Sequence, residues 1–278
     1  MTIPKSPYAS TTTPPARMTG PKLAAMAREG TPIAMLTCYD ASFATLCERA
    51  GVDVLLVGDS LGMVIQGRAS TLPVTLDDVI YHTRCVAAGS ERALVIADLP
   101  FGSYQATPAD AYAASVAALR ADAQMVKLEG GAWIAPTVEF LVARGVPVCG
   151  HVGLQPQAVN VLGGYRVQGK TPDAAAAVLA DARAVVDAGA SLLILECVPK
   201  DLGALVTREV GVPVIGIGAG PSCSGQVLVI YDALGITPGK PARFVRNFTA
   251  GQDGVESAIR AYVEAVRERS FPGPEHCF

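Results

Sequence analysis

The stretch Met125-Val-Lys-Leu-Glu129 is a short apolar run that ends in a carboxylate and carries an amine two residues earlier. Three more runs of this kind end in an acid or a histidine: Ala93-Leu-Val-Ile-Ala-Asp98, Val146-Pro-Val-Cys-Gly-His151 and Leu192-Leu-Ile-Leu-Glu196. A fifth run ends in Asp59-Ser60: Val52-Asp-Val-Leu-Leu-Val-Gly-Asp59. Short runs that are apolar on both faces are typical of buried parallel strands. The pattern therefore predicts polar side chains gathered at one end of a parallel sheet.

Helical segments separate these runs, and several of them pass into the next run through a glycine, as in Ala50-Gly-Val and Ala188-Gly-Ala. Glycine in the left-handed conformation ends a helix at little cost. The repeated alternation favours one closed parallel sheet, an α/β fold of the (β/α)8 TIM-barrel class in a single domain. The competing fold is an open doubly wound sheet. We expect the eight strands at residues 33–38, 54–57, 94–97, 125–128, 148–150, 192–195, 214–217 and 243–247.

Residues 1–20 are rich in Thr, Pro and Ser and show no period, so we interpret them as a flexible N-terminal arm. This arm could instead order against a neighbouring subunit. No such linker divides residues 30–270, and residues 21–278 are expected to form the catalytic barrel.

The composition excludes several classes of protein. The net charge is −3 and no long block of Lys or Arg is present, which argues against nucleic acid as a partner. No apolar run reaches the ~20 residues that a membrane span requires, and the N-terminus lacks a secretory pattern. Seven cysteines without CxxC spacing indicate buried, reduced thiols in a cytoplasmic protein rather than a disulfide or zinc framework.

The carboxylates of Asp59, Asp98 and Glu129 are candidate metal ligands. Each of the two aspartates, taken singly, could equally cap the turn or helix that follows it. Burying three lone carboxylates at one rim would be costly, and an oxygen-rich ligand set without cysteine is the kind that Mg²⁺ prefers. The pattern therefore predicts a magnesium site.

Three further side chains are candidates for substrate chemistry. Lys127 lies two residues from Glu129 on one strand, so both face the same side, as an anion-binding amine beside a metal or as a structural ion pair. Glu196 ends the most apolar strand and is either a general base or a hydrogen-bonded structural acid. His151 has small neighbours that permit close approach to a substrate, although a lone histidine is more often structural.

Two glycine-rich segments lie near the predicted rim. The run Ile215-Gly-Ile-Gly-Ala-Gly-Pro221 does not fit the GxGxxG spacing, so a dinucleotide site is not supported. The polar segment at residues 160–169 follows the fifth predicted strand and is long enough to act as a lid.

The chain resembles the ketopantoate hydroxymethyltransferase (3-methyl-2-oxobutanoate hydroxymethyltransferase) family over nearly its whole length from about residue 20. The resemblance is carried by a colinear set of stretches: Leu36-Thr-Cys-Tyr-Asp40, Val57-Gly-Asp-Ser-Leu-Gly-Met63, Ser70-Thr-Leu-Pro-Val-Thr75, Ala97-Asp-Leu-Pro-Phe101, Met125-Val-Lys-Leu-Glu-Gly-Gly131, Pro147-Val-Cys-Gly-His151, Gly163-Gly-Tyr165, Leu195-Glu-Cys-Val-Pro199, Pro213-Val-Ile-Gly-Ile-Gly-Ala-Gly220 and Pro272-Gly-Pro-Glu-His276.

The resemblance implies a TIM barrel that assembles as a homodecamer. It implies transfer of a hydroxymethyl group from 5,10-methylenetetrahydrofolate to 3-methyl-2-oxobutanoate, giving 2-dehydropantoate for pantothenate and coenzyme A synthesis. It implies that Asp59 and Asp98 ligate Mg²⁺, which chelates the 2-oxo acid, and that Glu129 supports the metal directly or through water. Ser60 and Lys127 would hold the oxo acid. Glu196 would remove the C3 proton to give a magnesium-stabilised enolate.

Two departures from the family pattern lie at Ala69 and Ser224, where many members carry aspartate. Neither is an expected metal or base position, so they bear on lid or folate contacts. The nearest rival is a carbon–carbon lyase or phosphonomutase of the isocitrate-lyase-like barrels, although the Lys-x-Cys-Gly-His run of such lyases is absent. A non-catalytic oligomeric scaffold is the other alternative, and it would leave the rim charges without a use.

Overall fold

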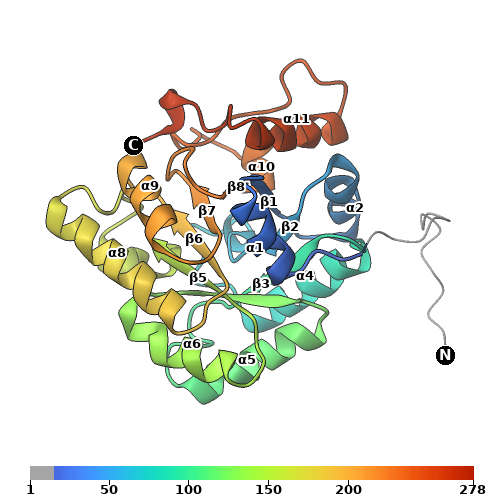
Figure 1. Ribbon diagram of the computed structural model, residues 1–278. Coiled ribbons are helices and arrows are strands. Elements are labelled where there is room, and N and C mark those ends of the chain that lie inside the picture. Colours follow the sequence, from blue (N-terminus) through green and yellow to red (C-terminus); the bar gives the residue numbers. More distant parts are fainter. Residues whose placement is uncertain (1–15) are drawn as a thin grey trace, which may run out of the picture.

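The computed structural model describes residues 16–278, in which eight parallel strands form a closed barrel (Figure 1). Each strand pairs with the next one in sequence, and β1 pairs with β8 to close the ring. The predicted TIM barrel is thus confirmed, and the open doubly wound sheet is excluded. The strands are β1 (Ile33–Thr37), β2 (Val54–Val57), β3 (Leu94–Asp98), β4 (Met125–Glu129), β5 (Val148–Gly153), β6 (Leu192–Glu196), β7 (Val214–Ile217) and β8 (Gly225–Leu228).

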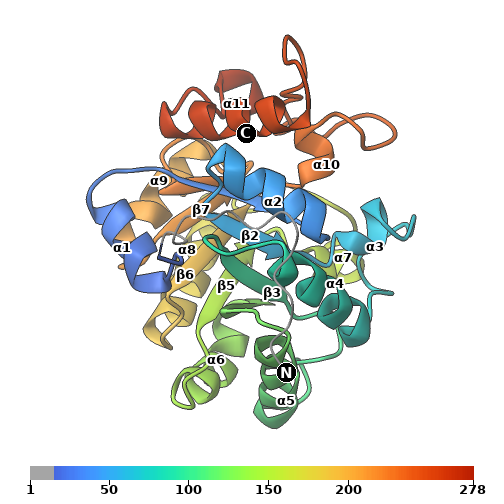
Figure 2. The same cartoon turned by 90° about the vertical axis from the view of Figure 1, so that its right-hand side faces the viewer.

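Helices surround the barrel in all three ribbon views, and Figure 2 shows several of them from the side. Three longer helices begin at threonine N-caps, because Thr75, Thr107 and Thr171 each accept a hydrogen bond from a backbone N–H three residues on. The helices after β1 are α2 (Ala41–Ala50), α3 (Leu61–Val64), α4 (Leu76–Ala88), α5 (Pro108–Arg120), α6 (Ala135–Val142), α7 (Val159–Leu162), α8 (Pro172–Asp187), α9 (Lys200–Glu209), α10 (Ile230–Ala233) and α11 (Val255–Arg267), with 3₁₀ turns η1 (Ala132–Ile134), η2 (Pro156–Ala158) and η3 (Pro274–His276).

The prediction of the eighth strand at residues 243–247 is wrong. Those residues form an irregular segment, and β8 is Gly225–Leu228. The error arose because residues 218–224 join β7 to β8 without a helix, whereas a parallel crossover usually contains one. Helices α10 and α11 follow β8 instead, and α11 packs beside α2.

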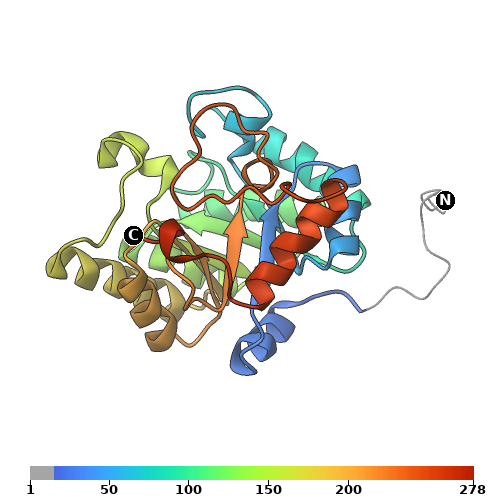
Figure 3. The ribbon, with the colours of Figure 1, turned by 90° about the horizontal axis from the view of Figure 1, so that it is seen from above.

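An additional helix, α1 (Gly20–Arg28), covers the N-terminal end of the barrel (Figure 3). Its Leu23 is buried among side chains that fill the barrel interior, which stabilises the fold by about 1.5–3 kcal/mol. Residues 1–15 of the predicted arm lie outside the described residues. From Arg17 onward the chain is bound to the barrel, because the Arg17 guanidinium donates to the carbonyls of Ser90 and Ala93.

Side chains along each strand point alternately into the barrel interior and out toward the helices, and this alternation positions the site. Leu94 and Ile96 fill the interior below Asp98, and Met125 does so below Lys127. Because inward positions recur every second residue, polar residues late in a strand enter the barrel mouth above an apolar floor. All seven cysteines are free thiols, six of them buried, as predicted. No helix within residues 16–278 is long and apolar enough to cross a membrane.

Candidate active site

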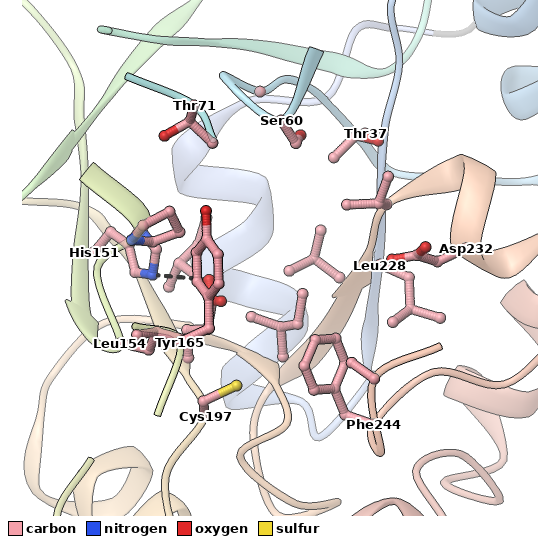
Figure 4. A pocket seen from close by; sticks show the side chains of 18 of the residues that line it. Thr37, Ser60, Thr71, His151, Leu154, Tyr165, Cys197, Leu228, Asp232 and Phe244 are labelled. Atoms are coloured by element: carbon pink, nitrogen blue, oxygen red, sulfur yellow. Dashed lines mark ion pairs between the residues drawn. The ribbon is translucent and has the colours of Figure 1, made fainter. Parts of the chain in front are cut away.

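A pocket of about 600 Å³ lies at the C-terminal ends of the strands. Figure 4 shows His151 and Tyr165 on one side of it and Leu228, Asp232 and Phe244 on the other. Every predicted site residue lines this pocket: Asp59, Ser60, Asp98, Lys127, Glu129, His151 and Glu196. The apolar part of the lining includes Leu56, Leu154, Ile194, Ile217, Val227, Phe244 and Phe278.

Lys127 connects two buried carboxylates. Its Nζ donates to Asp98 Oδ1 at 2.7 Å and to Glu129 Oε1 at 3.1 Å. Asp59, just beyond β2, donates its backbone N–H to Asp98 Oδ2 at 3.1 Å. The structure therefore brings three acids from three strand ends around one amine.

The same three acids could hold a cation. One ligand oxygen from each of Asp59, Asp98 and Glu129 can be chosen so that all lie within 4.8 Å of one another, and all three residues are buried. An all-oxygen donor set of this kind fits a small hard cation such as Mg²⁺.

The electrostatics of the cluster also favour a cation. Burial raises the pKa of Asp59 well above its ordinary value, and the neighbouring Asp98 carboxylate adds to this rise. Burial likewise raises the pKa of Asp98, although Lys127 opposes it. Burial disfavours the charge on Lys127, but Asp98 and Glu129 raise its pKa well above the ordinary value. The raised pKa values of Asp59 and Asp98 indicate that their negative charges are costly in this buried site, and a bound cation would offset that cost.

His151 lies between two carboxylates. Its Nδ1 is 3.2 Å from Glu129 Oε1 and its Nε2 is 3.3 Å from Glu196 Oε2, although neither contact is aligned as a hydrogen bond. Burial and Lys127 disfavour the imidazolium, but Glu129 and Glu196 raise the pKa of His151 to about 9. Burial also opposes the charge on Glu129, yet Lys127 and His151 lower its pKa to about 2. The imidazolium therefore links the acid cluster to Glu196.

Glu196 is the most accessible acid of this group, with 15% of its side chain exposed against 2% for Glu129. It ends β6 beside Gly153 of β5, where a Cβ atom would lie 2.3 Å from the Glu196 carbonyl oxygen. Glycine 153, with φ +89°, therefore allows β5 to approach the backbone of Glu196 closely. Gly150, directly beside His151, instead makes room for Val185 of α8, because a Cβ atom there would lie 2.4 Å from the Val185 side chain. These glycines therefore serve packing, and Glu196 remains open to a molecule in the pocket.

Residues that the sequence did not single out complete the site. The first is Tyr39, which follows β1 and whose hydroxyl shares a hydrogen bond of 2.9 Å with the predicted Ser60. Gln157, from η2, donates its side-chain N–H to Asp59 and its backbone N–H to Glu129, each at 3.0 Å. Both residues follow strands, which is the signal that could have identified them.

The predicted lid segment lies at the pocket. Tyr165, Arg166 and Val167 line it, and the Tyr165 hydroxyl is 3.9 Å from Met63 Sδ on α3. Gln168 donates its backbone N–H to the carbonyl of Cys197, directly after Glu196, at 2.8 Å. The segment thus joins the end of β6 to the side of the pocket near α3.

Comparison of the sequence with known proteins gives a consistent result. The family model described as "Ketopantoate hydroxymethyltransferase" matches residues 17–274. A Burkholderia thailandensis protein named 3-methyl-2-oxobutanoate hydroxymethyltransferase is 62% identical over 261 residues, which cover 94% of this chain and 96% of that protein. A Burkholderia mallei protein of the same name matches to the same extent.

Solved structures resemble the fold at much lower identity. A phosphonopyruvate hydrolase has a TM-score of 0.60 at 15% identity, covering 91% of this chain and 97% of that one. A 2,3-dimethylmalate lyase of the PEP mutase/isocitrate lyase superfamily has a TM-score of 0.54 at 16% identity, covering 80% and 84%. At this identity the likeness concerns the barrel alone.

Proposed function

Since the chain belongs to the ketopantoate hydroxymethyltransferase family, we propose that it transfers a hydroxymethyl group from 5,10-methylenetetrahydrofolate to 3-methyl-2-oxobutanoate. The product would be 2-dehydropantoate, the precursor that pantothenate synthesis requires. The observation that carries this proposal is the cluster of Asp59, Asp98 and Glu129 around Lys127, with Glu196 open to the same pocket. Such a site can bind a 2-oxo acid and remove a proton from it.

Asp59 and Asp98 would ligate Mg²⁺, with Glu129 supporting it, and the oxo acid would lie against this site. The bound cation would supply Lewis-acid stabilisation of the negative charge that develops on the substrate when C3 loses its proton. The charged Lys127 amine and the Ser60 hydroxyl are the groups suited to hold the substrate's oxygen atoms. His151 contacts both Glu129 and Glu196, so it would face the substrate from a position between the acid cluster and the base.

Glu196 is the group we propose as the base. Its carboxylate accepts the C3 proton, and the carbon nucleophile so formed attacks the methylene carbon of the folate. Water then supplies the hydroxyl group as the remaining bond from this carbon to the folate nitrogen breaks, which releases tetrahydrofolate. The nearby His151 Nε2 lies 3.3 Å from Glu196 Oε2, and as an imidazolium it would attract this carboxylate. The apolar lining of the pocket, including Ile194 and Phe244, would limit the access of water to the reacting carbon.

Three further properties follow from family membership and are part of the proposal. The folate would enter the same pocket, whose volume of about 600 Å³ exceeds what the small oxo acid needs. The chain would form a homo-oligomer, a decamer in the family pattern, and would act in the cytoplasm. Light scattering at micromolar concentration tests the assembly, because a particle of only 28.7 kDa would contradict it.

A product assay tests the proposed reaction. The purified chain is given Mg²⁺, 3-methyl-2-oxobutanoate and 5,10-methylenetetrahydrofolate, and 2-dehydropantoate is measured by mass spectrometry. We expect product formation that requires the folate and stops when EDTA removes the metal. Cleavage or rearrangement of a 2-oxo acid without folate would instead support a lyase or mutase of the related barrels.

A further inference from the structure

Gln157 lies beside the acid cluster, and both its side-chain amide nitrogen and its amide oxygen have hydrogen-bond partners. The amide nitrogen donates to Asp59 Oδ2 and to the Leu99 carbonyl oxygen, both at 3.0 Å. The amide oxygen lies 2.8 Å from the Tyr104 hydroxyl and accepts from Gln105 Nε2 at 3.1 Å. An amide offers two N–H donors, and both are used here. Its oxygen accepts from Gln105 and shares the single hydrogen of the Tyr104 hydroxyl with the Glu129 carbonyl oxygen, which lies 3.0 Å from that hydroxyl.

These partners fix which way the amide points. A flipped amide would place its oxygen against the Leu99 carbonyl and the Asp59 carboxylate, which are both acceptors. It would also turn its N–H groups toward Gln105 Nε2, another donor. Because Gln157 is buried, water cannot compensate for such mismatches. The N–H group is thereby held against Asp59.

The backbone of Gln157 holds a second acid. Its N–H donates to Glu129 Oε2 at 3.0 Å. The Tyr104 hydroxyl accepts from the Glu129 backbone N–H at 3.1 Å, so the residue that supports the Gln157 amide also anchors β4 at Glu129. Gln157 and Tyr104 therefore connect the Asp59 carboxylate to Glu129 through hydrogen bonds that do not involve Lys127.

The hydrogen bonds differ among the carboxylate oxygens. Both oxygens of Asp98 and both of Glu129 have a donor from Lys127 or a backbone N–H. Asp59 has a donor at Oδ2 only, from Gln157, and no donor from within residues 16–278 reaches its Oδ1. Lys127, the cation of the cluster, makes its hydrogen bonds to Asp98 and Glu129.

We propose that Gln157 is a positioning residue for the metal site, which orients the Asp59 carboxylate so that Oδ1 is left for the cation. This inference rests on the proposed metal site. Groups that orient metal ligands through hydrogen bonds contribute about 10–100-fold to metal affinity. Gln157 acts through Asp59 and Glu129. It is not among the residues that line the pocket, and it makes no hydrogen bond to Glu196.

Direct measurement of Mn²⁺ binding tests this role without an activity assay. Free Mn²⁺ is measured by electron paramagnetic resonance during titration of the full chain, and Mg²⁺ competition shows that the two cations share the site. Gln157→Met keeps the length of the side chain but removes both amide groups, while the backbone bond to Glu129 stays possible. We expect its Kd for Mn²⁺ to rise about 10–100-fold.

Gln226→Met is the matched control. Gln226 is also a buried amide in the barrel, and its Nε2 donates to the Gly220 carbonyl at 3.1 Å, away from the three acids. Both variants lose buried hydrogen bonds and should lose some thermal stability. If Gln157 were merely structural, the two variants should change the Kd for Mn²⁺ alike. We expect only Gln157→Met to change it.

A second variant keeps the test decisive if Gln157→Met folds poorly. Tyr104→Phe removes one hydroxyl that holds the Gln157 amide, and we expect a weaker rise of the Mn²⁺ Kd in the same direction. If Gln157→Met folds and its Mn²⁺ Kd lies within twofold of the parent value, the role of Gln157 is overturned. If Gln157→Met does not fold, the same result in Tyr104→Phe overturns it. If the parent itself does not bind Mn²⁺, the metal site is wrong, and the inference fails with it.

Discussion

The Nζ atom of Lys127 lies 2.7 Å from Oδ1 of Asp98, and the two residues are direct register partners on β4 and β3. This pair is buried, so its charges are poorly screened by water. Lys127 is therefore the fixed positive charge around which the three acids are arranged. Its removal should make the protein depend on an added cation for stability.

We expect Lys127→Met to lower the free energy of unfolding by about 3–5 kcal/mol in EDTA, because it leaves buried carboxylates without their partner. Added Mg²⁺ should restore more stability to this variant than it adds to the parent. Urea unfolding with EDTA or Mg²⁺ measures both effects. Lys170→Met, which alters an exposed lysine, controls for the change of side chain. Equal responses of parent and Lys127→Met to Mg²⁺ would contradict this arrangement of charges.

Asp98→Ala should abolish the magnesium dependence and nearly all turnover, because it removes a central ligand of the proposed metal site. Circular dichroism should still show the barrel. Product formation is measured across a Mg²⁺ titration, beside Asp253→Ala as a control at an exposed acid. A folded Asp98→Ala variant with full metal-dependent activity would show that the assignment is wrong.

The capping box of α4 gives a pH dependence outside the site. The Asp78 carboxylate accepts hydrogen bonds from the Thr75 hydroxyl at 2.6 Å and the Thr75 backbone N–H at 2.9 Å. These bonds lower the pKa of Asp78 below its ordinary value. A lowered pKa stabilises the fold above the ordinary pKa of about 4, and this contribution is lost as the pH falls through the folded-state value.

Asp78→Asn should therefore be less stable than the parent at pH 6, by less than about 1 kcal/mol because the carboxylate is largely exposed. The difference should shrink as the pH falls below about 4. Urea unfolding of both proteins at several pH values measures it. A difference that stays constant down to pH 2.5, or grows, would be inconsistent with a lowered pKa.

Much of the site was predictable because strand periodicity is a local property. Lys127 and Glu129 stand two apart on one strand, and they do share the barrel interior. The strands that carry Asp98, His151 and Glu196 at or near their ends are parallel, so these residues had to reach the same rim.

The parts that were missed depend on contacts distant in sequence. The GQVL sequence of β8 has no helix before it and is recognised only through its pairing with β1 and β7. Gln157 is one of several glutamines, and only packing places its amide against Asp59 and Tyr104. Helix α1 did carry a local signal, Thr19-Gly-Pro21, with Thr19 as its N-cap, but it follows directly on a Pro-rich segment.

Exchange of the C3 proton of 3-methyl-2-oxobutanoate tests the role of Glu196 most directly. In D₂O with Mg²⁺ and no folate, nuclear magnetic resonance follows the loss of the C3 proton signal for the parent and for Glu196→Gln. Glutamine keeps the size of the side chain but cannot accept the proton. We expect the parent to exchange and Glu196→Gln to exchange about 10²–10⁴-fold more slowly, with Mn²⁺ binding unchanged. Exchange at the parent rate in Glu196→Gln would contradict its role as the base and would make His151 the next candidate.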